Sequence, residues 1–175
     1  WMGDKSGKEV VGDTLHWRDG GHLFTEKKYG DFSFRFEFTM EPEGNNGLAI
    51  RYPGGGNPAY DGMTELQILD HDNKRYAKID PRQVHGSAYG MVGAHRGYFR
   101  PYGEWNYEEV TVVGSTIRVE LNGAVILDAD LSQVSEYLAD KAHPGKMLKE
   151  GHLGFAGHGD KHYFQFRRLT LREGN

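Results

Sequence analysis

Side chains that could do chemistry line one face of a short strand predicted at residues 64–70, TELQILD. Side chains of a β-strand alternate between two faces. Glu65, Gln67 and Leu69 therefore point one way, and the opposite face is apolar up to its last residue. A carboxylate beside an amide can line a substrate cleft. It can also belong to the solvated face of an antiparallel sheet, and the pattern alone leaves both interpretations open.

Two further charged residues occupy the polar faces of predicted strands. Glu37 lies in DFSFRFEFTM (31–40) and Arg51 in GLAIRYP (47–53), each opposite an apolar face. If these strands are neighbours of TELQILD in one sheet, their charged groups form a patch on its outer surface. A solvated face is again the alternative.

Two motifs combine polar or aromatic groups with small residues. In HGSAYG (85–90), glycines let the backbone and the His85 imidazole approach a ligand closely, whereas a buried histidine bonded to a carbonyl is the alternative. In PYGEWNYEEV (101–110), Trp105 can stack on a sugar and Asn106 can bond its hydroxyls. A tryptophan of the core is the alternative there.

A third motif, GFAGHGDKHYF (154–164), places His158 between glycines in a tight turn. Asp160 and His162 follow, and a His-x-Asp-x-His spacing could ligate a metal ion. We favour a solvated turn for Asp160 and His162. The sequence therefore leaves open whether a divalent metal ion is bound, and which one.

A conventional retaining glycosidase needs two carboxylates close together, one as nucleophile and one as acid. Glu65 shares its face with Gln67 and Leu69, and Asp70 points to the other side. The spacing therefore argues against that mechanism on this strand.

Alternating patterns predict the elements that position these residues. The run 31–40 is the clearest half-buried strand. HYFQFRRLTLR (162–172) is another, whose alternation slips near Arg167 and indicates a bulge. The apolar face of the first of these strands consists of Phe32, Phe34, Phe36, Phe38 and Met40.

Residues 110–131 hold three short strands joined by turns at Gly114-Ser115 and Asn122-Gly123, and Asn-Gly is a strong hairpin signal. Helical evidence is confined to SQVSEYLADKA (132–142), which can form one short helix capped by Ser132. Many antiparallel strands with short turns predict an all-β fold, a β-sandwich or jelly roll.

Composition narrows the function. The 175 residues fit a single domain, and a net charge of -4 with a pI of about 6.1 gives no electrostatic footprint for nucleic acid. Cysteine is absent, which excludes disulfides and thiolate metal sites. No apolar stretch is long enough to span a bilayer, and no signal-peptide pattern opens the chain.

The order and spacing of several segments resemble the 3-keto-disaccharide hydrolase family through nearly all of the chain. The segments are LFTEKKYGDFSFRFEF (23–38), NNGLAIRY (45–52), YDGMTELQILD (60–70), HGSAYG (85–90), GEWN (103–106), LNG (121–123) and GHLGFAGHGD (151–160). The resemblance implies a concanavalin A-like sandwich of two antiparallel sheets over 1–175, and an exported or periplasmic protein. The family's usual opening segment is missing or short, which predicts that a leader or first strand precedes Trp1.

The resemblance also implies a carbohydrate substrate, a glycoside whose glucose is oxidised to a ketone at carbon 3. The ketone acidifies the proton on carbon 2, so that a base can remove it, the glycosidic oxygen can leave carbon 1, and water can add to the double bond. This route needs a base, an acid, and a metal ion or cationic side chain for the enolate.

The resemblance suggests roles for nine residues as hypotheses. Glu65 is the base or a metal ligand, His85 a second base or acid, and His158 an acid or ligand. Arg51 stabilises negative charge and is oriented by Glu37. The predicted substrate contacts are Gln67, Tyr89 as proton donor to the leaving oxygen, Trp105 and Asn106.

A non-catalytic carbohydrate-binding module of the same fold is the alternative function, because fold does not fix function. Such a module needs Trp105 and amides, but not Glu65, Arg51 and His85 together. The sequence leaves open the aglycone, the linkage, the assignment of base and acid, and the oligomeric state.

Overall fold

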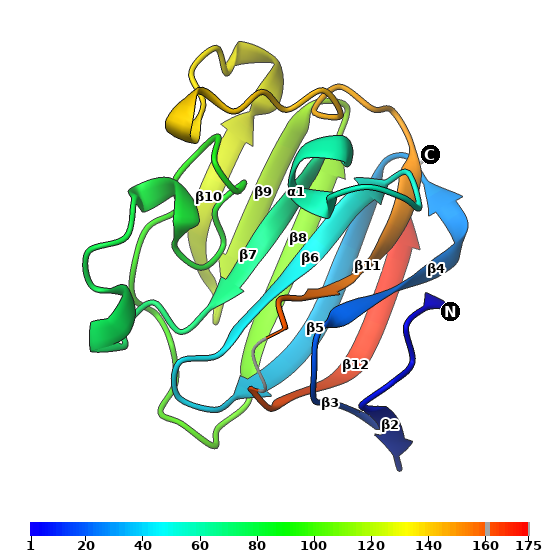
Figure 1. Ribbon diagram of the computed structural model, residues 1–175, viewed down its shortest axis with the longest axis vertical. Helices are drawn as coiled ribbons and strands as arrows, with labels where there is room; N and C mark the ends of the chain where they lie inside the picture. Colours follow the sequence, from blue (N-terminus) through cyan, green and yellow to red (C-terminus); the bar gives the residue numbers. More distant parts are fainter. Residues whose placement is uncertain (160–161, 175) are drawn as a thin grey trace.

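Two antiparallel sheets pack face to face in the computed structural model, which describes residues 1–159 and 162–174 (Figure 1). The five-stranded sheet has the order β1 (Met2–Gly3), β4 (Gly21–Tyr29), β11 (Gly151–Gly157), β6 (Asn45–Tyr52) and β7 (Thr64–Leu69). The seven-stranded sheet has the order β10 (Ala124–Asp130), β9 (Thr116–Leu121), β8 (Asn106–Val113), β5 (Phe32–Met40), β12 (Phe164–Glu173), β3 (Thr14–Trp17) and β2 (Lys8–Val11). The predicted all-β sandwich is confirmed.

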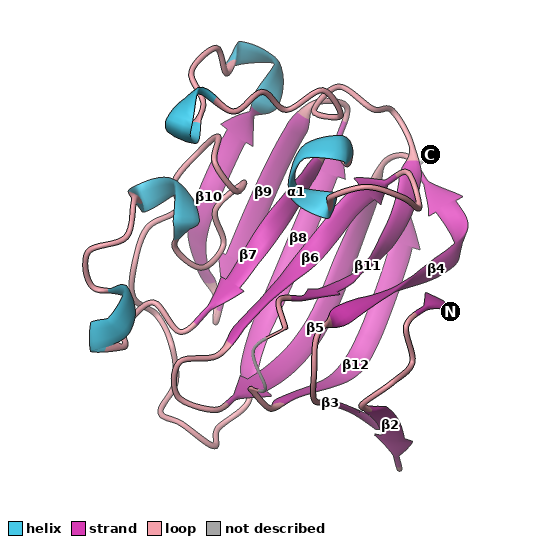
Figure 2. Cartoon of the chain, in the orientation of Figure 1, coloured by secondary structure: helices cyan, strands magenta, loops and turns pink. Residues whose placement is uncertain are grey.

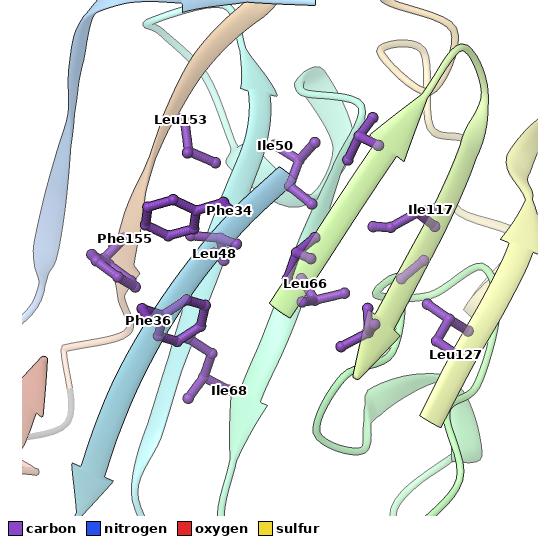
Figure 3. Packing of buried hydrophobic residues seen from close by; sticks show 14 of the residues in the cluster. Phe34, Phe36, Leu48, Ile50, Leu66, Ile68, Ile117, Leu127, Leu153 and Phe155 are labelled. Atoms are coloured by element: carbon purple, nitrogen blue, oxygen red, sulfur yellow. The ribbon is translucent and has the colours of Figure 1, made fainter. Parts of the chain in front are cut away.

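The core lies between the sheets, where the alternating apolar residues of each layer meet. Phe34 and Phe36 of β5 pack against side chains of the facing sheet such as Leu48 and Leu66, as Figure 3 shows. Phe36 is fully buried, and its ring centroid lies 5.6 Å from that of Phe155 in an edge-on arrangement. Burying each such side chain contributes roughly 1.5–3 kcal/mol. The predicted apolar face of 31–40 is confirmed.

Local turn chemistry sets the register of the outer strands. Asn122 and Gly123 both have positive φ, 51° and 87°, as a tight β9–β10 hairpin requires. In β12 the register shifts between Arg167 and Thr170, and Arg168 has a φ of 53°. The predicted hairpin and the predicted bulge are both confirmed.

The helical prediction for 132–142 is wrong. This segment forms two 3₁₀ turns, η3 (Leu131–Gln133) and η4 (Leu138–Asp140), and Ala139 at a φ of 52° interrupts the second. Asp130, not Ser132, caps η3, because its carboxylate accepts a hydrogen bond from the Ser132 backbone N–H.

The described residues contain one α-helix, α1 (Pro58–Asp61), in the connection between β6 and β7. The Asn57 side chain accepts from the Ala59 N–H at 3.0 Å, and Pro58 occupies the first turn, where its missing N–H costs nothing. Figure 2 shows α1 and the 3₁₀ turns as short segments of connecting loops; the remaining two are η1 (Lys74–Tyr76) and η2 (Pro81–Gln83). Across the described residues, no helix has the length and apolar character needed to cross a membrane.

Candidate active site

A cleft of about 300 Å³ lies on the outer face of the five-stranded sheet, over β7. Glu65, Gln67 and Leu69 form its floor, and only 2%, 5% and 2% of their surfaces are exposed. The polar face of TELQILD is therefore not a solvated sheet surface. Loops on either side of the strand bury it and leave room for a ligand.

Small residues on the neighbouring strands make room for Glu65. Gly47 of β6 lies beside Gln67, and a Cβ atom at Gly47 would lie 2.1 Å from the Glu65 Oε1 atom. The next strand presents Gly154 and Ala156 on the same face. Because no side chain projects from Gly47, the Glu65 carboxylate can extend across β6 toward the end of β11.

At the end of β11, Glu65 meets His158. The His158 Nε2 atom is within hydrogen-bond contact of the Glu65 Oε1 atom, and the imidazole N–H donates to the carboxylate. The carboxylate is almost fully buried, whereas 34% of the His158 side chain is exposed. The pair therefore presents a titratable acid and a titratable base together at the wall of a cleft.

His22 on β4 is a third member of this cluster, and the sequence reasoning did not select it. Burial lowers its pKa, and the nearby Glu65 carboxylate partly counteracts that shift, whereas His158 reinforces it. Its buried Nδ1 atom has no hydrogen-bond partner within residues 1–159 and 162–174. The alternation of 21–29 places His22 on an outer face, but only the pairing of His22 with Ala156 places it near Glu65.

The amide of Gln67 is half satisfied. Its Nε2 atom donates to the Asn45 Oδ1 atom at 3.0 Å, while its buried Oε1 atom has no partner among the described residues. An unpaired buried acceptor is costly, and a ligand hydroxyl in the cleft can satisfy it.

Tyr89 reaches the cleft because HGSAYG runs alongside β7. The Tyr89 N–H donates to the Glu65 carbonyl at 3.0 Å, and the Gly86 N–H donates to the Gln67 carbonyl at 2.7 Å. The Tyr89 hydroxyl accepts a hydrogen bond from the Gln83 side chain at 3.1 Å. Burial raises the pKa of Tyr89, so that its phenol stays protonated and can donate to a ligand.

His85 lies on the opposite side of β7, in the core. It is fully buried, with its ring close to those of Phe38 and Phe99 and its Nε2 atom 3.0 Å from a carboxylate oxygen of Glu108. Since the cleft is on the outer face, His85 does not reach it. His85 is buried, as the alternative interpretation of HGSAYG expected, but its ring nitrogens meet the Leu69 N–H and Glu108 and not a carbonyl, and the segment places Tyr89 in the cleft instead.

The expected pairing of Arg51 with Glu37 is wrong. Arg51 is buried at the end of β6, where its guanidinium donates to Asp31 at 2.9 Å and to three backbone carbonyls. Glu37 lies on the other sheet and pairs with Arg167 at 2.6 Å. Alternation assigned each residue to a polar face, but not to a sheet.

Trp105 and Asn106 also lie away from the cleft, at the start of β8 in the seven-stranded sheet. The Arg167 guanidinium covers the Trp105 ring at 3.9 Å from its centroid. The buried Asn106 Oδ1 atom accepts from the Arg100 N–H and from the Asn122 side chain, both at 2.9 Å. These contacts give both residues structural partners.

No group of three or more histidine and carboxylate side chains is arranged to hold a metal ion within residues 1–159 and 162–174. Of the His-x-Asp-x-His motif, Asp160 lies outside the described residues. The metal prediction stays open.

A β-sandwich with a polar cleft across the outer face of one sheet defines a concanavalin A-like protein. Residues 1–172 match the model of the 3-keto-alpha-glucoside-1,2-lyase-like domain, and the chain belongs to this family. The resemblance found in the sequence is thereby confirmed.

Three known proteins show how far the similarity extends. A 3-keto-disaccharide hydrolase from Bacteroides thetaiotaomicron is 29% identical over 181 residues. The match covers 87% of this chain and 62% of the relative, so that the chain spans less than two thirds of that protein. A provisionally named glycosyl hydrolase from Parabacteroides distasonis superposes with a TM-score of 0.85 at 21% identity, covering 98% and 92% of the two chains. Carbohydrate binding module CBM66 from Bacillus subtilis gives 0.57 at 13% identity, covering 95% and 91%, and likewise shares the fold.

Proposed function

We propose that the chain hydrolyses 3-keto-glycosides, with Glu65 and His158 as the reacting acid–base pair. The observation that supports this proposal is the hydrogen bond between a buried carboxylate and a half-exposed imidazole in the cleft. Family membership and the name of the Bacteroides relative supply the substrate class.

The reaction divides into an elimination and a hydration. The Glu65 carboxylate takes the proton from carbon 2, and the electron pair moves into the bond between carbons 1 and 2 as the glycosidic oxygen leaves with a proton from the His158 imidazolium, which becomes neutral imidazole. Water then adds to carbon 1, gives its proton to His158, and Glu65 returns its proton to carbon 2. The net change is hydrolysis, and both groups regain their starting protonation states.

Gln67 and Tyr89 supply the binding contacts in this proposal. The unpaired Gln67 Oε1 atom accepts a hydrogen bond from a sugar hydroxyl. The Tyr89 hydroxyl donates to the carbon 3 oxygen, where negative charge develops in the enolate. This role replaces the one expected for Arg51, whose donors are already bonded to Asp31 and to backbone carbonyls.

Product analysis tests the proposal. The wild-type chain should release the aglycone from a 3-keto-glucoside and not from its unoxidised parent, and release should be slower from a substrate deuterated at carbon 2. Glu65→Gln should lower turnover by about 10²–10⁴-fold, the usual contribution of a general acid or base. Glu37→Gln, on the other sheet, is the matched control and should leave turnover unchanged.

Two results would contradict the proposal. Equal release from the unoxidised parent would indicate a conventional glycosidase. Glycan binding that survives Glu65→Gln, with no release from any substrate, would indicate the binding module. The buried Glu65 carboxylate beside His158 argues against the module, because a binder gains nothing from burying a carboxylate at its ligand.

A further inference from the structure

The two ends of the cleft differ in chemistry. One end has the Asn57 amide, the Tyr60 phenol and the Lys141 ammonium, whose Nζ atom lies 3.6 Å from the Tyr60 ring centroid. The other end has Leu69 and Ile79 together with the ring of Tyr76, and its polar side chain, Asn45, already accepts a hydrogen bond from Gln67. A polar sugar ring matches the first end, and an apolar group matches the second.

The apolar end is built from side chains that do not belong to the core between the sheets. Leu69 is buried on the outer face of β7, and Ile79 is half-buried in the loop between η1 and η2. The Tyr76 hydroxyl donates to the Glu43 carbonyl at 3.0 Å, and its own carbonyl accepts from Arg96 at 3.0 Å. These bonds fix the Tyr76 ring as a wall of the cleft before any ligand binds.

The strand register indicates which end receives the leaving group. Asn45 pairs with Leu69, and Gly157, directly before His158, pairs with Asn46. His158 therefore leaves the sheet at the same end as Leu69. Because His158 is the proposed donor to the leaving oxygen, the aglycone should extend toward the apolar end.

The length of β7 determines where the sugar and the aglycone can lie. Four residues of strand separate Glu65 from Leu69, about 13 Å at 3.3 Å per residue. The keto sugar fits over Glu65 and Gln67, and the aglycone over Leu69. A cleft of about 300 Å³ lies at the lower end of ligand-pocket volumes, and so suits an aglycone of one ring.

We infer that this chain prefers 3-keto-glucosides with an apolar, planar aglycone, such as an aromatic alcohol, over 3-keto-disaccharides. The inference rests on the proposed function. The hydroxyls of a second sugar would lose water at Leu69, Tyr76 and Ile79 without gaining partners from these three side chains. An aromatic ring would bury apolar surface against the same three side chains.

The test compares the 3-keto derivative of benzyl glucoside with that of a glucose disaccharide of the same anomeric configuration. Both leaving groups are alkoxides, so that their chemical reactivity is similar. The benzyl compound should have a kcat/KM at least about tenfold higher, the usual range for pocket discrimination between apolar and mismatched groups. Ile79→Asn, similar in size but polar, should reduce this ratio about tenfold.

Lys141→Met at the polar end is the matched control. It should change kcat/KM for both substrates by the same factor and leave their ratio unaltered, since both carry the same keto sugar. Release from both substrates with equal efficiency, or a ratio that Ile79→Asn does not change, would overturn this inference alone. Release from neither would overturn the proposed function and this inference with it.

Discussion

Replacing Gly47 by alanine should inactivate the site without unfolding the protein. The added Cβ atom would lie 2.1 Å from the Glu65 Oε1 atom and 2.5 Å from its Cδ atom, whereas real Cβ contacts stay beyond 3.0 Å. The end of the Glu65 side chain must therefore move by about 1 Å, which changes its contact with His158. A misplacement of that size costs about 10²-fold in rate. Alanine is otherwise better than glycine in a strand, by roughly 0.5–1 kcal/mol, so that the melting temperature should change little.

Gly55→Ala is the matched control, because a Cβ atom at Gly55 would meet no described atom within 4 Å outside its two chain neighbours. The assay is aglycone release from a 3-keto-glucoside, with the melting temperature recorded for each variant. The reasoning is refuted if Gly47→Ala folds and turns over substrate as fast as Gly55→Ala. That result would mean that the carboxylate does not need its position over β6.

Three further outcomes are expected. Phe36→Ala should lower the free energy of unfolding by about 3–5 kcal/mol in urea titrations, because its buried ring packs edge-on against Phe155; a smaller loss would mean that the core collapses around the gap. Trp105→Ala should leave turnover unchanged, because the Trp105 ring lies under Arg167 on the other sheet. A large loss of kcat would mean that Trp105 does belong to the active site. Burial lowers the pKa of His71 to about 3, against about 6.5 in the unfolded chain. The neutral, buried His71 therefore contributes fully to the free energy of unfolding above pH 6.5, and about 2 kcal/mol of that contribution is lost by pH 5. Equal free energies of unfolding at pH 7 and pH 5 would contradict this.

The fold could be predicted from the sequence because the patterns that specify its strands and turns are local. The alternation of apolar and polar side chains along 31–40 determines which of them are buried, and the left-handed conformations of Asn122 and Gly123 suit a tight hairpin. The helix predicted near 132–142 does not form, because the local signals there conflict. Its apolar spacing was helical, but Asp130 and the φ of Ala139 favour isolated 3₁₀ turns.

Only part of the candidate site could be predicted from the sequence. Glu65, Gln67, Tyr89 and His158 do line one cleft, although they come from three separate segments of the chain. Alternation assigns a side chain to a face, whereas a site also requires the order of strands in the sheet. That order places His22 near Glu65, and no local pattern encodes it.

The same limit explains why Glu37 and Arg51 were associated with the site. Each lies on a polar face of its strand, but Glu37 is on the seven-stranded sheet and Arg51 turns toward Asp31. Sequence patterning cannot distinguish an outer face that loops cover from one that solvent covers. The cover over Glu65 depends on loops whose paths the sequence left undefined.

Two buried charged groups on neighbouring strands show how a structural site differs from a candidate active site. The guanidinium of Arg51 has four hydrogen-bond acceptors, so that its burial fastens the loops around it. Glu65 is equally buried, but it meets an imidazole whose side chain is 34% exposed. Taking a carboxylate out of water is costly, and the one hydrogen bond given for it in the part of the chain that the structure describes compensates for little of that cost. The glycine at position 47 leaves open the space into which this carboxylate extends, next to the unpaired acceptor of Gln67. An arrangement that adds so little to stability is better explained by the proton that the Glu65–His158 pair can transfer.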